Sequence, residues 1–364
     1  MKITKSKATK NNIKLVQKFS YFLASLNHLP YILVSIQTDG GITGYGEAAI
    51  GWDTTGEVQD GSLEIFIKFI EPILIGKELE SVGDIEIIMA EIDKYIYGNT
   101  ALKSGVEFAL LDALGKLRNL PVYDLVGGKK IDFVIPQKVF SFESQKLEAI
   151  EDNIREAFAG GVKIFKFKTG EKIDPLLALL QELSRINPRY RFVLDVNQGW
   201  VNYDQAMGNI KKLEQLDIAW IEQPIYHHDF AGMAEIRKKT KIPIMADESC
   251  HSLLDLENLH LRSAIDCVNI KLAKCGGILQ AKKLMRFCEN NGIGYMLGSM
   301  INSSLGVASD LHAATLGNLI SQDLTFPGRV ADDKFAEIKY DEYKAYIPQS
   351  SGLGIDPASN QQVN

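Results

Sequence analysis

The stretch KIFKFKTG, from Lys163 to Gly170, is typical of a β-strand that carries lysines on one face. Phe165 and Phe167 alternate with Lys166 and Lys168, and successive side chains of a strand point to opposite faces. The apolar, β-prone residues predict a buried strand. The two ammonium groups on the other face therefore need partners, which the rest of the chain must supply.

The stretch belongs to a series of short apolar strands that alternate with amphipathic helices. The expected strands between residues 126 and 325 are IPQKVFSF, VKIFKFK, RFVLDVN, IAWIEQP, IPIMADES, CVNIKLAK, GIGYMLG and LISQDLTF. This alternation predicts parallel strands joined by right-handed crossovers, in an α/β fold with the spacing of a TIM-type barrel. Residues 1–125 have strands first and helices afterwards, as in YILVSIQTDGGITGYGEA, which predicts a separate α+β domain.

Five successive barrel strands each end near a charged residue, one β/α unit apart. These residues are Lys168, Asp195, Glu222, Asp247 and Lys271. The C-terminal ends of barrel strands converge on one mouth, where barrel active sites lie. A single aspartate after a strand is usually a helix cap or turn residue, but five in phase with the repeat indicate a functional cavity.

The residue types point to metal-assisted proton transfer. Three adjacent carboxylates form an all-oxygen set suited to Mg²⁺, and without a cation they would repel one another. A lysine must lose its proton near neutral pH to act as a base, and a neighbouring cation such as Lys166 or the metal favours this. A metal-bound carboxylate substrate becomes acidic at its α-carbon. Lysines flanking the carboxylates, Lys168 and Lys271, then predict a racemase or epimerase.

Composition excludes several classes of partner. The 364-residue chain has a net charge of −6, which favours neither nucleic acid nor an anionic membrane as a partner. Its four cysteines form no C-x-x-C pair and are expected to be reduced thiols of a cytoplasmic protein. The polar N-terminus is unlike a signal peptide, and no apolar run reaches membrane-spanning length. A homo-oligomer is plausible.

Taken together, the motifs resemble the enolase superfamily, specifically its muconate-lactonising-enzyme subgroup. The matching pieces are the K-x-K of Lys166–Lys168, LDVNQGW, IEQP, ADES and NIKLAKCGG. The resemblance implies a capping domain over residues 1–125, a (β/α)7β barrel over 126–325, and a C-terminal segment, 326–364, that packs back on the cap.

The same resemblance assigns roles to residues at the barrel mouth. It implies one Mg²⁺ per chain, an acid/base pair, a lysine that polarises the substrate carboxylate, and two residues that orient the ligands or the lysines. The resemblance assigns Mg²⁺ to Asp195, Glu222 and Asp247, and the acid/base pair to Lys168 and Lys271. Lys166 would polarise the substrate carboxylate. Asn197 and Glu248 would orient the metal ligands or the lysines. The chemistry implied is proton transfer through an enediolate.

Within the subgroup the chain most resembles dipeptide epimerases of the L-Ala-D/L-Glu type. Those enzymes carry an Asp-x-Asp after the last barrel strand for the ammonium group of the dipeptide, and here Asp323 fits the first position but Thr325 occupies the second. Ser299 and Met300 in MLGSM, and Gln137 on the first barrel strand, are expected to contribute further substrate contacts.

Two capping-domain loops, residues 19–30 and 48–61, are expected to set specificity. An arginine of the Ala-Glu epimerases is replaced near Ala24, while the second loop offers Asp53, Glu57 and Asp60 beside Trp52. This favours dipeptides with cationic or hydrophobic residues over Ala-Glu, although the acids would equally suit a solvated loop.

Other functions remain open. N-succinylamino acid racemase, o-succinylbenzoate synthase and muconate cycloisomerase would keep the site and change the substrate. A Schiff-base aldolase using Lys168 would leave the three carboxylates unexplained, and a non-catalytic barrel would leave the whole array unexplained.

Overall fold

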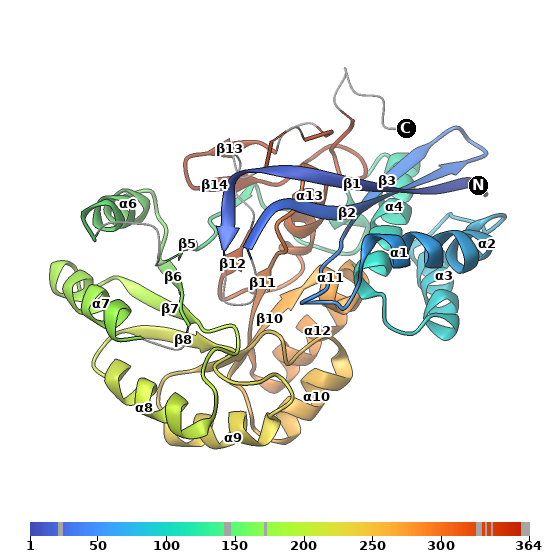
Figure 1. Ribbon diagram of the computed structural model, residues 1–364. Coiled ribbons are helices and arrows are strands. Elements are labelled where there is room, and N and C mark those ends of the chain that lie inside the picture. Colours follow the sequence, from blue (N-terminus) through green and yellow to red (C-terminus); the bar gives the residue numbers. More distant parts are fainter. Residues whose placement is uncertain are drawn as a thin grey trace.

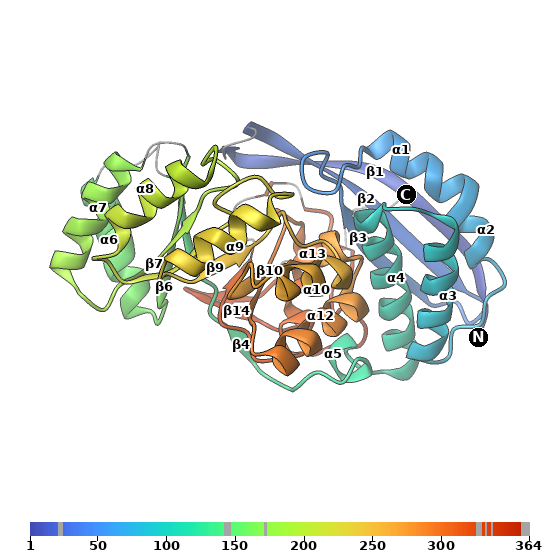
Figure 2. The same ribbon diagram turned by 90° about the horizontal axis from the view of Figure 1, so that it is seen from below.

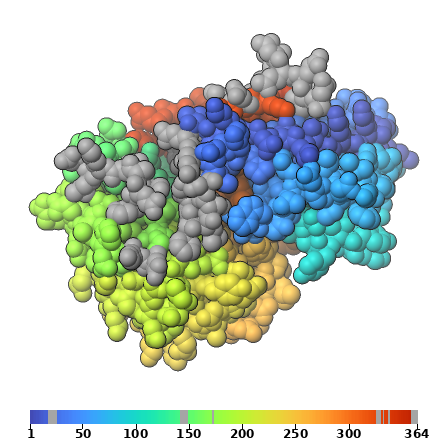
Figure 3. Space-filling view, viewed as in Figure 1, coloured from blue at the N-terminus to red at the C-terminus, as the bar shows by residue number. Residues whose placement is uncertain are grey.

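The computed structural model describes residues 1–20, 25–141, 147–170, 173–324, 330–331, 333–335 and 338–357. Figure 1 shows two parts, an antiparallel sheet with helices at the N-terminus and, below and to the left of it, a parallel barrel of strands. Figure 3 shows that the two parts are in direct contact on the face in view. Within the described residues, none of the helices is long and apolar enough to cross a membrane.

The N-terminal cap is a three-stranded antiparallel sheet covered by helices. Its strands lie in the order β1-β2-β3. Its elements are β1 (Ile3–Ser20), β2 (Ser25–Thr38), β3 (Thr43–Ala49), α1 (Gln59–Ile65), the π-helix η1 (Phe66–Ile70), α2 (Glu71–Leu74), α3 (Val82–Tyr95), α4 (Thr100–Arg118) and α5 (Val122–Leu125). The expected hairpin of residues 31–48 is present as part of β2 and β3.

Helix α4 packs directly on β3 because two glycines leave room for it. A Cβ atom at Gly46 would lie 2.0 Å from the carbonyl oxygen of Gly105, and one at Gly44 would lie 2.2 Å from that of Ala109. The motif GYGEA is therefore a close-packing site between a strand and a helix. Glu47, the glutamate of this motif, directly follows Gly46 on β3.

The barrel has eight parallel strands in the order β12-β11-β10-β9-β8-β7-β6-β5, which confirms the predicted fold class. The backbone N–H of Gln137 donates to the carbonyl of Gln322 at 2.8 Å and joins the two ends of the sheet. Helices α6 to α10 lie outside the strands (Figures 1 and 2). The strands are β5 (Lys138–Ser141), β6 (Ile164–Lys168), β7 (Arg191–Asp195), β8 (Ile218–Glu222), β9 (Ile244–Ala246), β10 (Cys267–Lys271), β11 (Gly294–Gly298) and β12 (Gln322–Asp323).

The barrel helices follow the amphipathic segments between these strands. They are α6 (Leu147–Ala159), α7 (Asp174–Ile186), α8 (Tyr203–Leu213), α9 (Phe230–Lys239), α10 (Leu253–Leu261), α11 (Leu272–Cys275), α12 (Ile278–Asn291) and α13 (Ser304–Ala313). Their buried faces carry mainly aliphatic side chains, such as Leu176, Leu180 and Leu183 on α7. Burial of this apolar surface is what holds each helix on the sheet.

The C-terminal segment contacts both the cap and the start of the barrel. Strands β13 (Tyr340–Asp341) and β14 (Lys344–Tyr346) form a small sheet with β4 (Phe133–Val134). Isolated bridges join Leu15 to Val330 and Pro121 to Gly352. The predicted domain boundaries at residues 125 and 325 stay predictions, and residues 325–329 lie outside the described part of the chain.

Candidate active site

The five charged residues in phase with the strand repeat come together at one end of the barrel. Lys168, Asp195 and Glu222 end β6, β7 and β8, and the strand register places them side by side. Asp247 is the first residue after β9, and Lys271 is the last of β10. Each of these strands is mainly apolar, and each ends on or just before a charged residue.

Lysine side chains lie between the carboxylates. Lys166 is almost fully buried, and its Nζ is 2.8 Å from Asp195, 2.9 Å from Glu222 and 2.9 Å from Asp323. Lys168 Nζ lies 2.6 Å from Asp195 Oδ2, on the same side of the mouth. These contacts answer the question raised by the opening strand, since both of its ammonium groups pair with carboxylates of neighbouring strands.

Lys271 and Lys274 form a second group around Asp247. Lys271 Nζ is 2.7 Å from Asp247 Oδ2, and Lys274 Nζ is 2.6 Å from Asp247 Oδ1. Lys274 also donates to the carbonyl oxygens of Asp247 and Asn269. Each oxygen of Asp247 therefore has its own ammonium partner.

Burial and charge set the proton affinities of these groups. Burial, together with the negative charges of Asp195 and Asp247, raises the pKa of Glu222 to about 6. Burial alone would also raise the pKa of Asp195, but Lys166 and Lys168 outweigh it and hold that pKa below its usual value. Burial lowers the proton affinity of Lys271, yet Asp247 outweighs it and raises the pKa of that lysine. A basic role for Lys271 therefore requires its ion pair with Asp247 to open.

Asn197 and Glu248 are linked to each other beside the carboxylates. Asn197 Nδ2 donates to Glu248 Oε1 at 3.1 Å, and its backbone N–H donates to Asp195 Oδ1. Asn197 Oδ1 accepts from Lys168 at 3.1 Å. Burial and the charges of Asp247 and Asp195 raise the pKa of Glu248 to about 7. The pair thus connects one predicted base with one predicted metal ligand.

The three buried carboxylates at the mouth are the type of ligand that a hard cation prefers. Asp195, Glu222 and Asp247 are at most 1% exposed, and burial, followed by the charges of Asp195 and Asp247, raises the pKa of Glu222. Carboxylate oxygens are the ligands that Mg²⁺ prefers. Within the described residues, no three acidic, histidine or cysteine side chains stand close enough together to hold a metal ion as placed. Metal binding at these carboxylates therefore requires the lysines between them to shift.

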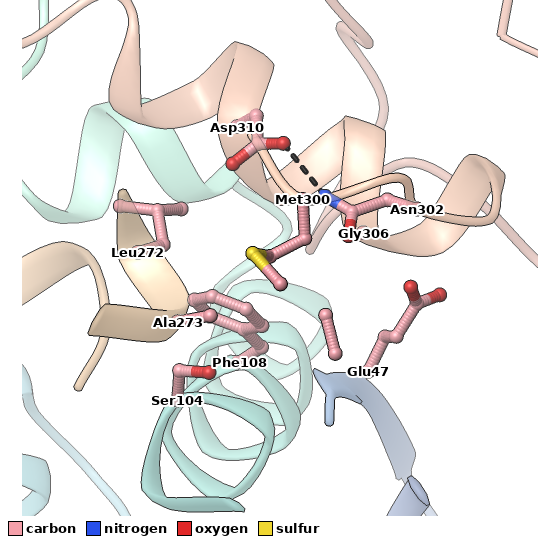
Figure 4. A pocket seen from close by; sticks show the side chains of 10 residues that line it. Glu47, Ser104, Phe108, Leu272, Ala273, Met300, Asn302, Gly306 and Asp310 are labelled. Carbon is pink, nitrogen blue, oxygen red and sulfur yellow. Dashed lines mark hydrogen bonds between the residues drawn. The ribbon is translucent and has the colours of Figure 1, made fainter. Parts of the chain in front are cut away.

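The predicted substrate contacts are only partly brought to the mouth. Asp323 lies there, paired with Lys166, and its carbonyl accepts from the backbone N–H of Ser299 at 2.8 Å. Met300 points into a small cavity between cap and barrel, among Phe108 and residues of the segment after Lys271 (Figure 4). Thr325 lies outside the described residues.

Gln137 lies beside the last barrel strand, and its contact with substrate stays a prediction. It precedes β5, four residues before Ser141, which pairs with Lys168. Its backbone N–H donates to the carbonyl of Gln322, the residue before Asp323 in β12, at 2.8 Å. Its side chain is buried, and neither amide atom has a hydrogen-bond partner among the described residues.

In the second specificity loop, residues 48–61, fewer acidic side chains are available to contact substrate than the composition suggests. Glu57 is buried and accepts from the backbone N–H groups of Ala101 and Leu102 at 2.8 and 3.0 Å, so it caps helix α4. Asp60 pairs with Lys10. Trp52 is 60% exposed. Ala24, in the first loop, lies outside the described residues.

Sequence reasoning missed two buried residues that hold Asp247. One is Lys274, described above. The other is Gln223, whose backbone has a positive φ of 39° and whose Oε1 accepts from the N–H groups of Asp247 and Ser249. Their signal was present in the quoted motifs, as the second lysine of NIKLAKCGG and the glutamine of IEQP.

An eight-stranded barrel with lysines and carboxylates at its mouth, under an antiparallel cap, is the architecture of enolase-superfamily proteins. Residues 6–127 match the model described as the mandelate racemase/muconate lactonizing enzyme N-terminal domain, and residues 149–361 match the enolase C-terminal domain-like model. The chain belongs to this family, which confirms the resemblance drawn from the motifs.

Curated relatives match over nearly the whole chain. It is 32% identical over 358 residues to the N-succinyl-L-Arg/Lys racemase of Bacillus cereus, covering 98% of this chain and 95% of that one. It is also 32% identical over 362 residues to the L-Ala-D/L-Glu epimerase of Bacillus subtilis, covering 98% and 97%. The hydrophobic dipeptide epimerase of Enterococcus faecalis is 31% identical over 327 residues, with 89% and 90% covered.

Solved structures agree with the fold. The N-succinyl Arg/Lys racemase from Bacillus cereus superposes with a TM-score of 0.90 at 32% identity, covering 99% of this chain and 96% of that one. The dipeptide epimerase from Cytophaga hutchinsonii, solved with Mg and the dipeptide D-Ala-L-Val, superposes with a TM-score of 0.89 at 27% identity, covering 99% and 97%.

Proposed function

We propose that this protein is an isomerase that inverts the α-carbon of an amino acid derivative, with Lys168 and Lys271 as the two bases. The observation that carries the proposal is the placement of these lysines on opposite flanks of three buried carboxylates, each paired with a different one. A substrate held between them would present opposite faces of its α-carbon to the two amines. The curated racemase and epimerase relatives support this reaction class.

In this proposal each lysine moves one proton. One neutral amine removes the α-proton, and the ammonium group of the other lysine delivers a proton to the opposite face. Lys166 stays positively charged, because its three carboxylate neighbours raise its pKa despite complete burial. Its fixed charge would favour negative charge that develops on a nearby substrate carboxylate.

Asp195, Glu222 and Asp247 would hold Mg²⁺. When bound, the ion would supply positive charge for the substrate carboxylate, as a Lewis acid does. The Mg-containing dipeptide epimerase structures of the family support this assignment.

The substrate class that we propose first is a dipeptide whose C-terminal residue is inverted. Asp323 supports it, because a carboxylate at the end of the last barrel strand suits the ammonium group of a dipeptide. Three curated relatives are named L-Ala-D/L-Glu epimerase, hydrophobic dipeptide epimerase and D-Ala-D/L-Ala epimerase, the last from Cytophaga hutchinsonii, and these names support a dipeptide substrate. With Glu57 committed to helix α4, hydrophobic side chains have more support than cationic ones.

A second candidate is the racemisation of N-succinylamino acids. One observation favours it: Asp323 Oδ2 is already 2.9 Å from the buried ammonium group of Lys166. A carboxylate with this partner attracts a substrate ammonium less strongly, whereas an acylated nitrogen carries no charge. The Bacillus cereus relative is named for this reaction on arginine and lysine derivatives.

A deuterium-exchange screen tests both candidates. The protein would be incubated with Mg²⁺ in D₂O and pools of L,L-dipeptides or N-succinylamino acids, and α-deuteration would be read by mass spectrometry. We expect a one-dalton gain that EDTA abolishes. Exchange confined to succinylated compounds would select the second candidate, and an absence of exchange in both pools would refute the proposed reaction.

A further inference from the structure

The loop between β11 and α13, residues 299–303, starts between two groups of the candidate site. In the barrel sheet, Gly298 at the end of β11 is paired with Lys271 on one side and with Asp323 on the other. The next residues, Ser299 and Met300, are among the expected substrate contacts. The shape of this loop therefore fixes one wall of the mouth.

Helix α13 follows this loop, and its first backbone N–H groups are satisfied by side chains from other parts of the chain. Glu47, on cap strand β3, accepts from the backbone N–H of Ser303 at 3.1 Å and from its hydroxyl group. Ser303 Oγ accepts from Leu305, and Asp333 of the C-terminal segment accepts from the N–H of Ser304 at 2.7 Å. Free N–H groups at a helix start normally bond water or local caps.

The approach of Glu47 is close enough to restrict the residue opposite. A Cβ atom at Gly306 would lie 2.9 Å from Glu47 Oε1, and the N–H of Gly306 is a further donor to the carboxylate. Glu47 is only 3% exposed. Figure 4 shows its carboxylate facing the same cavity into which Met300 points.

A second cap glutamate makes an equivalent contact with the neighbouring barrel unit. Glu107 of α4 accepts from the N–H of Leu279, at the start of α12, at 3.2 Å. A Cβ atom at Gly277 would lie 2.3 Å from Glu107 Oε1. The segment that follows Lys271 is thus also held at a helix start by a glutamate of the cap.

We infer that Glu47 is a positioning residue, which fixes the β11–α13 loop by clamping the start of α13 to the cap. It does not reach the reacting atoms. Its effect would be to hold Ser299 and Met300 in one arrangement relative to Lys271 and Asp323. The consequence for substrate binding rests on the proposed function, whereas the consequence for loop order does not.

The test compares Glu47→Gln with a matched control, Glu57→Gln. Glu57 is also a buried glutamate at a helix start, but its helix, α4, lies within the cap. We expect both variants to have a lower melting temperature. Only Glu47→Gln should speed backbone deuterium uptake in residues 299–306, measured by mass spectrometry.

The catalytic readout is the Michaelis constant for α-proton exchange. Loss of the hydrogen bonds that Glu47 accepts should raise KM for Glu47→Gln about tenfold with a smaller change in kcat. A wild-type protein without exchange activity would refute the proposed function, while the uptake comparison would still test the clamp.

Unchanged uptake over residues 299–306 in Glu47→Gln, or an equal increase in Glu57→Gln, would overturn the inference. Ser303→Ala gives a milder variant if Glu47→Gln does not fold. It removes one donor to Glu47 and should also speed uptake in this segment, and wild-type uptake in that variant would count against the clamp.

Discussion

Alanine in place of Lys168 or Lys271 should separate the two halves of the proposed reaction. Each variant loses one of two proton-transfer groups, and general acid–base catalysis by one side chain contributes about 10²- to 10⁴-fold. Epimerisation needs both groups, so it should fall by that factor in each variant. Exchange of the α-proton needs only the base on one face, so one substrate stereoisomer should still exchange.

Both variants should remain folded because no buried carboxylate is left alone. Without Lys271, Asp247 keeps Lys274 at 2.6 Å, and without Lys168, Asp195 keeps Lys166 at 2.8 Å. The loss of one such pair should cost about 1–3 kcal/mol of unfolding free energy. Lys163→Ala, at an exposed site just before β6, is the control for general effects of lysine removal.

The assay is α-deuteration of each pure stereoisomer in D₂O, followed by NMR. Lys168→Ala and Lys271→Ala should retain exchange of opposite stereoisomers. Retained exchange of both stereoisomers in either variant would refute the two-base assignment. Retention of the same stereoisomer in both would also refute it, because the lysines would then not act on opposite faces.

Three further predictions concern the metal, a buried acid and the cap. Mg²⁺ should raise the melting temperature of the wild-type protein but not that of Asp247→Asn, because an ion that binds only the folded protein stabilises it. An equal rise in both proteins would place the ion elsewhere. Burial raises the pKa of Glu107 from 4.5 to about 8, so the folded state holds a proton that the unfolded chain releases. Stability should therefore fall by about 1.4 kcal/mol per pH unit between pH 4.5 and 8, and Glu107→Gln should remove this contribution in urea unfolding; an identical slope in both proteins would contradict it. Gly46→Ala should cost at least about 1–3 kcal/mol in the same assay, because its Cβ would meet the Gly105 carbonyl, and wild-type stability would refute that packing argument.

The barrel and the charged strand ends could be predicted because they repeat. Each β/α unit is short, its strand is apolar, and its functional residue falls at the same point of the unit, so periodicity alone aligns the side chains. The N-terminal strand could not be predicted in this way. Residues 3–20 form the long strand β1, although they are rich in lysine, because β1 lies at the edge of its sheet and buries only residues such as Ile13 and Leu15.

Contacts between parts distant in sequence could not be predicted either. Glu57 was an acid in an exposed-looking loop, and only the fold shows that it caps α4. Gln137 was expected to contact substrate because its strand leads to the mouth; the fold buries its side chain beside β12, and the substrate contact stays a prediction. Strand assignment gives the direction of a side chain, whereas its depth depends on the register of neighbouring strands.

In the proposed mechanism, Lys274 would allow Lys271 to be paired with a carboxylate and still act as a base. Lys271 must release Asp247 before it can accept a proton from substrate, and separating a buried ion pair is costly when the carboxylate is left unpaired. Here the other oxygen of Asp247 remains 2.6 Å from Lys274, which is 1% exposed and also bonded to two backbone carbonyls. The contact with Lys274 would therefore lower the cost of freeing Lys271. On the opposite side of the mouth, Lys166 does the same for Lys168 through Asp195. Each proposed base is thus accompanied by a second, deeper lysine that keeps its carboxylate neutralised.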